Sequence, residues 1–208
     1  MADFDIPDIP WPKKGDKPFM VEGDDWYNRA CLNDLGVGLS WYLYPDGYKH
    51  AADLLVEHLM STNLNKRQID SLVYPIVFLY RQYIELILKR LIRDGNKLLN
   101  ISEKLPQGHK INNLWKNCRV ILEKVWSNES GEELDVIEAC IKQFSVKDPT
   151  STAFRYPTDL EGNPSLPKMQ INLRNLLEVM RRLSSFLESC SIGISEELNN
   201  EQEAEYEN

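Results

Sequence analysis

The stretch from Ser71 to Asp94 constrains the fold of this chain most, because it predicts a long helix that is apolar on nearly every side. Hydrophobic residues recur around its whole circumference and leave a thin polar stripe: Val77, Leu79, Tyr80, Tyr83, Ile84, Leu86, Ile87, Leu88, Leu91 and Ile92. Such a helix buries its surface when other helices surround it. We therefore expect it at the centre of a bundle, ending at Gly95.

Three charged residues, Arg81, Glu85 and Lys89, make up the polar stripe of this helix. Their spacing of four residues aligns them along one edge, where Glu85 can pair with either neighbour. Charges in a largely buried setting need partners. They also interrupt the most apolar part of the chain, and no basic start followed by an apolar run opens the sequence. We expect a cytoplasmic protein that does not enter a membrane.

Apolar residues at helical spacing predict further helices before and after the central one. Two stripes precede it, separated by an expected turn at 45–47: Tyr27, Cys31, Leu35, Leu39 and Tyr42, then Tyr48, Ala52, Leu55 and Leu59. Helices are also expected over 111–125, from a capping box of Ser130 and Glu133 to Phe144, and over 173–190. Because no run of alternating strands appears, the prediction is an all-α, up-and-down helical bundle of about five to six helices.

The two ends of the chain differ in composition from its middle. Prolines at 7, 10, 12 and 18 predict an extended N-terminal arm over residues 1–23. Residues 24–191 are expected to form a single helical domain, since the chain is long enough for one well-buried core. The segment 192–208 carries 6 acidic and no basic residues, which predicts a disordered acidic tail.

The net charge of -8 is unevenly distributed, because residues 81–124 carry 10 basic and 4 acidic groups. Two interpretations stay open: a basic patch that binds phosphate groups, or a solvated helix face. The first predicts salt-sensitive binding of RNA or nucleotide that weakens when Lys89 and Arg90 are both neutralised.

The segment STAFRYPTD places Arg155 between two aromatic residues, ahead of a proline. One interpretation is an ion pair with Glu85, Asp148 or Asp159 that attaches the loop to the bundle. Removing one partner of such a buried pair would cost about 3–5 kcal/mol of stability.

The other interpretation is that the planar guanidinium of Arg155 holds a phosphate or stacks on a base. Both interpretations require Arg155 to fold back toward the charged edge of the central helix. The expected ligand-binding residues are Arg81, Glu85, Lys89, His109, Arg155 and Tyr156.

Three segments of the chain share motifs with a known family: YPIVFLYRQYIELILKRLI, GHKINNLWKNC and DPTSTAFRYPTD. The motifs are Glu85 with Leu88-Lys89, Gly108-His109 with Leu114, and Arg155-Tyr156-Pro157. Together they resemble the HEPN superfamily (higher eukaryotes and prokaryotes nucleotide-binding) over roughly residues 70 to 190. That resemblance implies a small helical bundle, a homodimer, and a setting in prokaryotic defence or toxin–antitoxin systems.

Active HEPN ribonucleases carry an arginine and a histidine separated by four to six residues, and this chain lacks that motif. No arginine stands five to seven positions before His50, His58 or His109, and no histidine follows Arg155. The prediction is therefore a non-catalytic module that binds RNA, nucleotide or a protein partner. The alternative is a metal-independent endoribonuclease with a rearranged site of His109, Arg155 and Arg81.

Metal and cofactor chemistry has little support in the sequence. The four cysteines lie far apart without a CxxC pair, which predicts reduced core thiols. Glycine-rich phosphate loops and the GxSxG, HExxH and ExxH patterns are missing. We expect neither a metal site nor a cofactor.

Overall fold

The computed structural model describes residues 11–19, 26–32, 34, 36–61, 66–127 and 131–206, and it divides into two units, residues 1–34 and 35–208. In the first unit, the described part of the predicted arm has no helix or strand, and Trp11 and Phe19 are exposed. The helix expected from Tyr27 is wrong there, because a single 3-10 turn, η1 (Trp26–Asn28), is followed by irregular chain.

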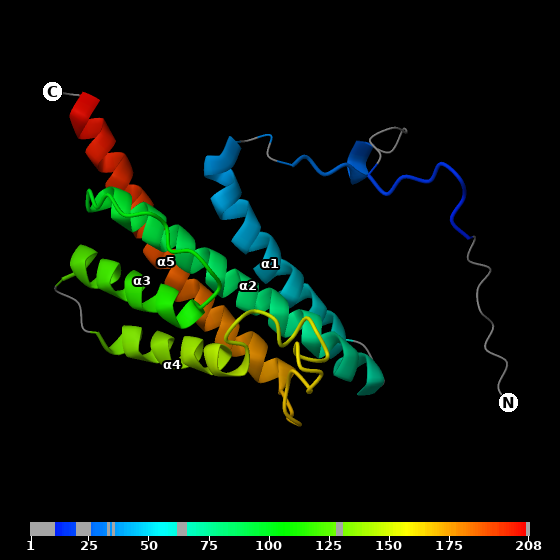
Figure 1. Ribbon diagram of the computed structural model, residues 1–208. Coiled ribbons are helices and arrows are strands. Elements are labelled where there is room, and N and C mark those ends of the chain that lie inside the picture. Colours follow the sequence, from blue (N-terminus) through cyan, green and yellow to red (C-terminus); the bar gives the residue numbers. More distant parts are fainter. Residues whose placement is uncertain are drawn as a thin grey trace, which may run out of the picture. The chain divides into compact units, whose positions relative to one another are not determined.

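The described residues of the second unit form five α-helices (Figure 1). They are α1 (Gly36–Ser61), α2 (Lys66–Leu98), α3 (Ile111–Val125), α4 (Glu132–Lys147) and α5 (Leu173–Tyr206). In the described part of the chain the one β-type contact is an isolated bridge between Thr158 and Pro164. The predicted all-α helical bundle is confirmed.

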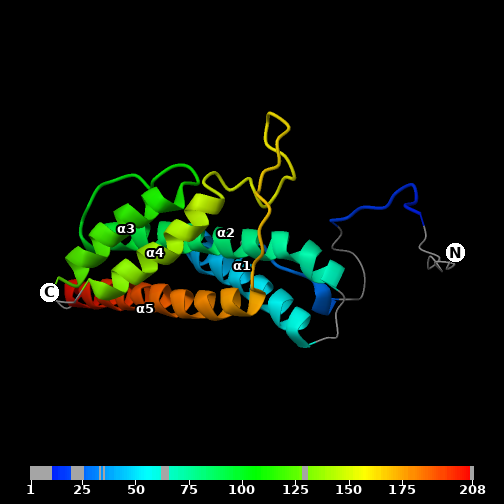
Figure 2. The same ribbon diagram turned by 90° about the horizontal axis from the view of Figure 1, so that it is seen from below.

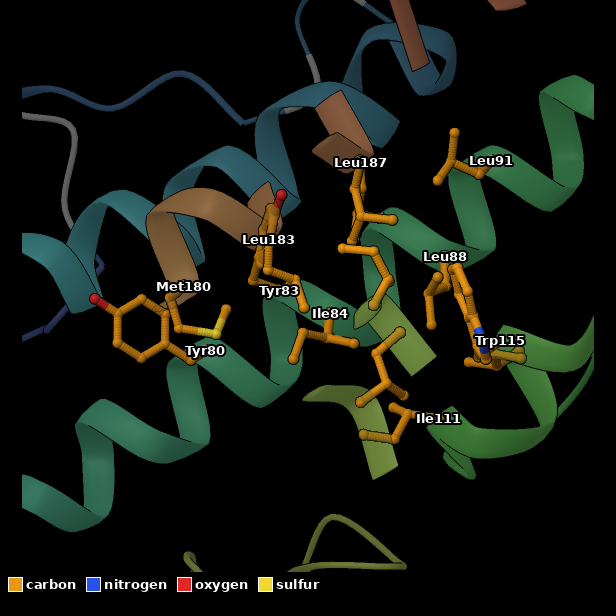
Figure 3. Packing of buried hydrophobic residues seen from close by; sticks show 14 of the residues in the cluster. Tyr80, Tyr83, Ile84, Leu88, Leu91, Ile111, Trp115, Met180, Leu183 and Leu187 are labelled. Atoms are coloured by element: carbon orange, nitrogen blue, oxygen red, sulfur yellow. The ribbon is translucent and has the colours of Figure 1, made fainter. Parts of the chain in front are cut away.

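Helix α2 lies at the centre of the bundle, as its all-round hydrophobic character predicts. It contacts α1, α3 and α5, while α3 and α4 lie together along its C-terminal half (Figure 2). Figure 3 shows α2 side chains between residues of α5 and α3: Ile84 and Leu88 lie among Leu183, Leu187, Ile111 and Trp115. By length and composition α2 could also cross a membrane, but here its apolar surface packs against the other helices.

The predicted turn at 45–47 is wrong, since α1 runs unbroken through Pro45. A proline inside a helix loses a hydrogen bond and costs about 3 kcal/mol. Pro45 is buried, at helical spacing from the buried residues Ala52, Val56 and Leu59. Packing of this stripe against the bundle offsets the local penalty.

The prediction that α2 ends at Gly95 is wrong, because Gly95 lies inside the helix. A Cβ atom added at Gly95 would lie 2.3 Å from Cγ2 of Ile121, so the glycine permits close approach of α2 and α3. The helix ends three residues later, where Asn100 has a φ of 53° and Ile101 N donates to Asn96 O at 2.8 Å. This is a left-handed helix end made by asparagine in place of glycine.

The prediction of a disordered tail from residue 192 also differs from the structure, because α5 is helical to Tyr206. Ile194 is fully buried and Leu198 packs against the core. With Cys190 they form a stripe at i, i+4 and i+8 on the face that meets the bundle, whereas Ile192 is exposed. Ser130 of the predicted capping box lies outside the described residues.

Candidate functional site

Arg81 is the centre of the polar network on α2 and is completely buried. Its Nη1 donates to Glu85 Oε2 at 3.2 Å, its Nε to the backbone oxygen of Asp148 at 2.9 Å, and its Nη2 to that of His109 at 2.6 Å. The Asp148 carboxylate lies 3.6 Å from Nε. One guanidinium thus joins the loop before α3 to the loop after α4, and we call this region the loop junction (residues 99–110 and 148–156 around Arg81).

Glu85 is the acidic partner at the loop junction and is 1% exposed. Its Oε1 accepts a hydrogen bond from Lys89 Nζ at 2.8 Å and lies 2.8 Å from His109 Nδ1. Burial by itself raises the pKa of the Glu85 carboxyl, but the hydrogen bonds from Lys89 and His109 outweigh it and lower the pKa below its usual value. The carboxylate therefore stays ionised although it is buried.

His109 is the histidine that the structure brings to this carboxylate. A carboxylate only accepts hydrogen bonds, so Nδ1 carries a proton, and in the neutral form of the ring the other nitrogen, Nε2, is an acceptor. The side chain is 62% exposed. The preceding Gly108 has a φ of 90°, which a residue with a side chain rarely adopts. The turn there carries the chain from the irregular loop into α3 with His109 facing Glu85.

Asp148 organises the second loop of the junction and is 1% exposed. Its Oδ1 accepts hydrogen bonds from the backbone nitrogens of Thr152 and Ala153 at 2.7 and 3.1 Å. Ser151, which lies between Asp148 and Thr152 in the sequence, is buried and has a φ of 66°. The carboxylate caps a tight turn, and this turn sets where the following residues Phe154 to Tyr156 emerge.

Arg155 does not make the predicted ion pair with Glu85, Asp148 or Asp159. It is exposed, its Nε donates to the backbone oxygen of Ser151 at 2.5 Å, and its guanidinium lies 5.7 Å from the Phe78 ring and 5.4 Å from the Tyr156 ring. The physical reason is that Arg81 already occupies the place beside both buried carboxylates, with a hydrogen bond to Glu85 and an ion pair of 3.6 Å to Asp148. The arginine that attaches this loop to the bundle is Arg81.

The basic segment 81–124 presents less charge to solvent than its composition suggests. Lys89 pairs with Glu85, and Arg90 is 4% exposed, so neither belongs to a basic surface. Arg119 is paired with three carboxylates, those of Glu123, Asp135 and Glu138. The cationic groups at the surface near the junction include Lys110, Lys147 and Arg155, which have no ion pair with any described carboxylate.

The structure brings together Arg81, Glu85, Lys89 and His109 of the predicted site, while Arg155 and Tyr156 lie on its outer side without contacting Glu85. Asp148 was not among the site residues predicted from the sequence, where it appeared as a partner of Arg155. Its position at the end of an expected helix, before Pro149 and a run of Thr and Ser, is a signal typical of a capping aspartate.

No group of three His, Cys, Asp or Glu residues in the described ranges is arranged to hold a metal ion. No disulfide links the described cysteines, of which Cys118 is buried and Cys31 is exposed. Cys31 is therefore not the core thiol that the sequence predicts.

Comparisons of the chain with protein-family models, curated proteins and solved structures found no match.

Proposed function

We propose that this chain is a non-catalytic, HEPN-like helical module that binds single-stranded RNA or a nucleotide at the loop junction. The observation that carries the proposal is the presence around Arg81 of exposed cationic side chains that have no partner among the described carboxylates. Lys110 follows His109 and Lys147 precedes Asp148, the two residues whose carbonyls accept from Arg81. Arg155 lies over Phe78, one turn of α2 before Arg81.

The loops that carry these cations are held in place by buried contacts. This favours a binding site for phosphate groups rather than a solvated helix face. The buried network of Arg81, Glu85 and Asp148 fixes both loops before any ligand arrives, so less ordering is required on binding. Single-stranded nucleic acid is bound by combining cations for the phosphates with aromatic faces for the bases. Tyr156 is 56% exposed and carries the Arg155 guanidinium on its ring, which supplies such a face.

Neutralising three of these cations is expected to weaken RNA binding at least tenfold. The variant is Lys110→Gln, Lys147→Gln and Arg155→Gln, measured by titrating labelled single-stranded RNA at several salt concentrations. Each lost phosphate contact lowers the slope of log affinity against log salt by about 0.7 for single strands. We therefore expect a slope that is lower by about 2.

The matched control neutralises three exposed lysines, Lys66, Lys97 and Lys124. The first two lie about 20 Å or more along α2 from Arg81, and Lys124 lies about as far along α3 from Lys110. It has the same net charge as the test variant. Equal losses of RNA affinity in both variants would show that binding depends on the overall charge of the protein and not on the loop junction. Undetectable or salt-independent binding by the unmodified chain would contradict the proposal and leave a module that binds a protein partner.

The contact between Glu85 and His109 favours a second function, a metal-independent endoribonuclease. A buried carboxylate on Nδ1 fixes the ring and its tautomer and stabilises the imidazolium, as needed for a general acid or base. The exposed Nε2 side then faces solvent, where a 2′-hydroxyl can approach. The homodimer and the defence setting rest on the HEPN resemblance and belong to both proposals.

Labelled RNA incubated with the purified chain in EDTA tests the second function. Cleavage by a His109 general acid or base is expected to fall by about 10²- to 10⁴-fold in His109→Ala. His50, an exposed histidine on α1, gives the control substitution His50→Ala, which should leave the rate unchanged. Absence of cleavage, or cleavage that survives both His109→Ala and Arg155→Ala, rejects the ribonuclease and leaves the binding proposal standing.

A further inference from the structure

A second site lies between α1, α2 and α5, about 14 Å along α2 from Arg81. It is a cavity of about 380 Å³ lined by Arg90 from α2, by Tyr42 and Asp46 from α1, and by Glu188, Ser195 and Glu196 from α5. Its volume falls within the range of small-molecule sites, about 300–1,000 Å³. None of the residues assigned to the loop junction contributes to it.

Arg90 is the unusual member of this cavity. It is 4% exposed, and its guanidinium lies over the Tyr42 ring at 4.5 Å from the centroid. It forms no hydrogen bond or ion pair with any residue that the structure describes, and its Nε is buried without a partner. Arg81 on the same helix has three acceptors at 3.2 Å or less. A buried charge is unfavourable unless it is paired, so Arg90 is a charge that lacks its partner.

The other charges in the cavity decide which kind of partner fits. Asp46 and Glu196 are exposed carboxylates, and Glu188 accepts a hydrogen bond from the Tyr83 hydroxyl at 3.1 Å. Three carboxylates around one guanidinium repel a simple anion such as phosphate. A molecule with a carboxylate for Arg90 and an ammonium group for the acidic rim satisfies both signs of charge.

We propose that this cavity binds a small zwitterion of the amino-acid class, with its carboxylate on Arg90 and its ammonium group on the carboxylates of Asp46 and Glu196. The hydroxyls of Tyr42 and Ser195, which lie 3.2 Å apart, supply further hydrogen-bonding groups. Because acidic residues exceed basic ones here, an amino acid with a second cationic group fits best. The inference is independent of the function proposed for the loop junction.

Calorimetric titration of the full chain with L-lysine tests the site, with 1,5-diaminopentane and inorganic phosphate as comparison ligands. We expect L-lysine to bind, and we expect 1,5-diaminopentane, which lacks the carboxylate, to bind at least tenfold more weakly. Arg90→Met keeps an unbranched apolar chain over Tyr42 and should weaken L-lysine binding at least tenfold. Absence of L-lysine binding, or phosphate binding that is as tight, overturns the proposal.

The acidic rim provides a second test that does not depend on folding of the Arg90 variant. Asp46→Asn combined with Glu196→Gln alters two exposed side chains and should also weaken L-lysine binding at least tenfold. Glu197→Gln is the matched control, because Glu197 is an exposed neighbour on α5 that does not line the cavity. Unchanged binding in the rim variant, or the same loss in Glu197→Gln, overturns the proposal.

Discussion

Replacing Arg81 with alanine is expected to lower the free energy of unfolding by about 3–5 kcal/mol, because removal of one partner leaves buried charge uncompensated. Glu85 and Asp148, each 1% exposed, would lose their common guanidinium. The backbone oxygens of His109 and Asp148 would lose their donor as well. Urea unfolding followed by circular dichroism measures this loss, which corresponds to a decrease in Tm on the order of 10 °C.

Arg155→Ala is the matched comparison for Arg81→Ala, since both substitutions remove one arginine from the junction. Arg155 is exposed and makes a single side-chain hydrogen bond, to the Ser151 carbonyl, so its removal should cost less than about 1 kcal/mol. The large loss of stability that the sequence predicted for removal of Arg155 is therefore expected for removal of Arg81. Equal losses for the two variants, or a larger loss for Arg155→Ala, would contradict the assignment of the hub.

The second large effect is expected at Gly95, where Gly95→Val should lower the free energy of unfolding by about 2–3 kcal/mol through overpacking. The new Cβ would lie 2.3 Å from Cγ2 of Ile121, and the two added methyl groups would require further displacement of α3. Valine has a higher helix propensity than glycine, which offsets a few tenths of a kcal/mol. Urea unfolding of the single variants measures the net loss.

Two controls separate crowding at Gly95 from a general effect of the substitution. Gly47 lies inside α1 with open space where its Cβ would be, so Gly47→Val should change stability by no more than about 0.5 kcal/mol. Adding Ile121→Ala to Gly95→Val removes the clashing Cγ2 atom. A coupling energy of at least about 1 kcal/mol between the two positions is expected, and strict additivity would refute the proposed contact.

The sequence alone predicts the central helix, because a helix that is apolar on nearly every side, with a charged edge, buries its surface when other helices surround it. It also predicts the alignment of Arg81, Glu85 and Lys89, and the structure shows the two expected hydrogen bonds to Glu85. These features depend on helix geometry within eight residues, which local sequence determines. The stripes that predict α3 and α4 depend on the same periodicity.

Pro45 and Gly95 show why helix boundaries were harder to predict. Both residues usually end helices, and both lie inside helices here because contacts with distant segments outweigh the local preference. The same holds for the acidic segment after residue 192, where Ile194 and Leu198 find partners on the bundle. Local composition could not show those partners.

The sequence by itself determined the helical class, the buried central helix and the charged edge along it, because each depends on short-range periodicity. Tertiary structure alone decided which arginine pairs with the buried carboxylates. The acceptors of Arg81 outside α2 are the backbone oxygens of His109 and Asp148, which lie 28 and 67 residues away in the sequence. Tertiary structure also decided that Arg90, nine residues further along α2, lacks any such acceptor in the described part of the chain. Two arginines on one helix acquire opposite roles because side chains from distant segments surround the first, whereas a cavity adjoins the second.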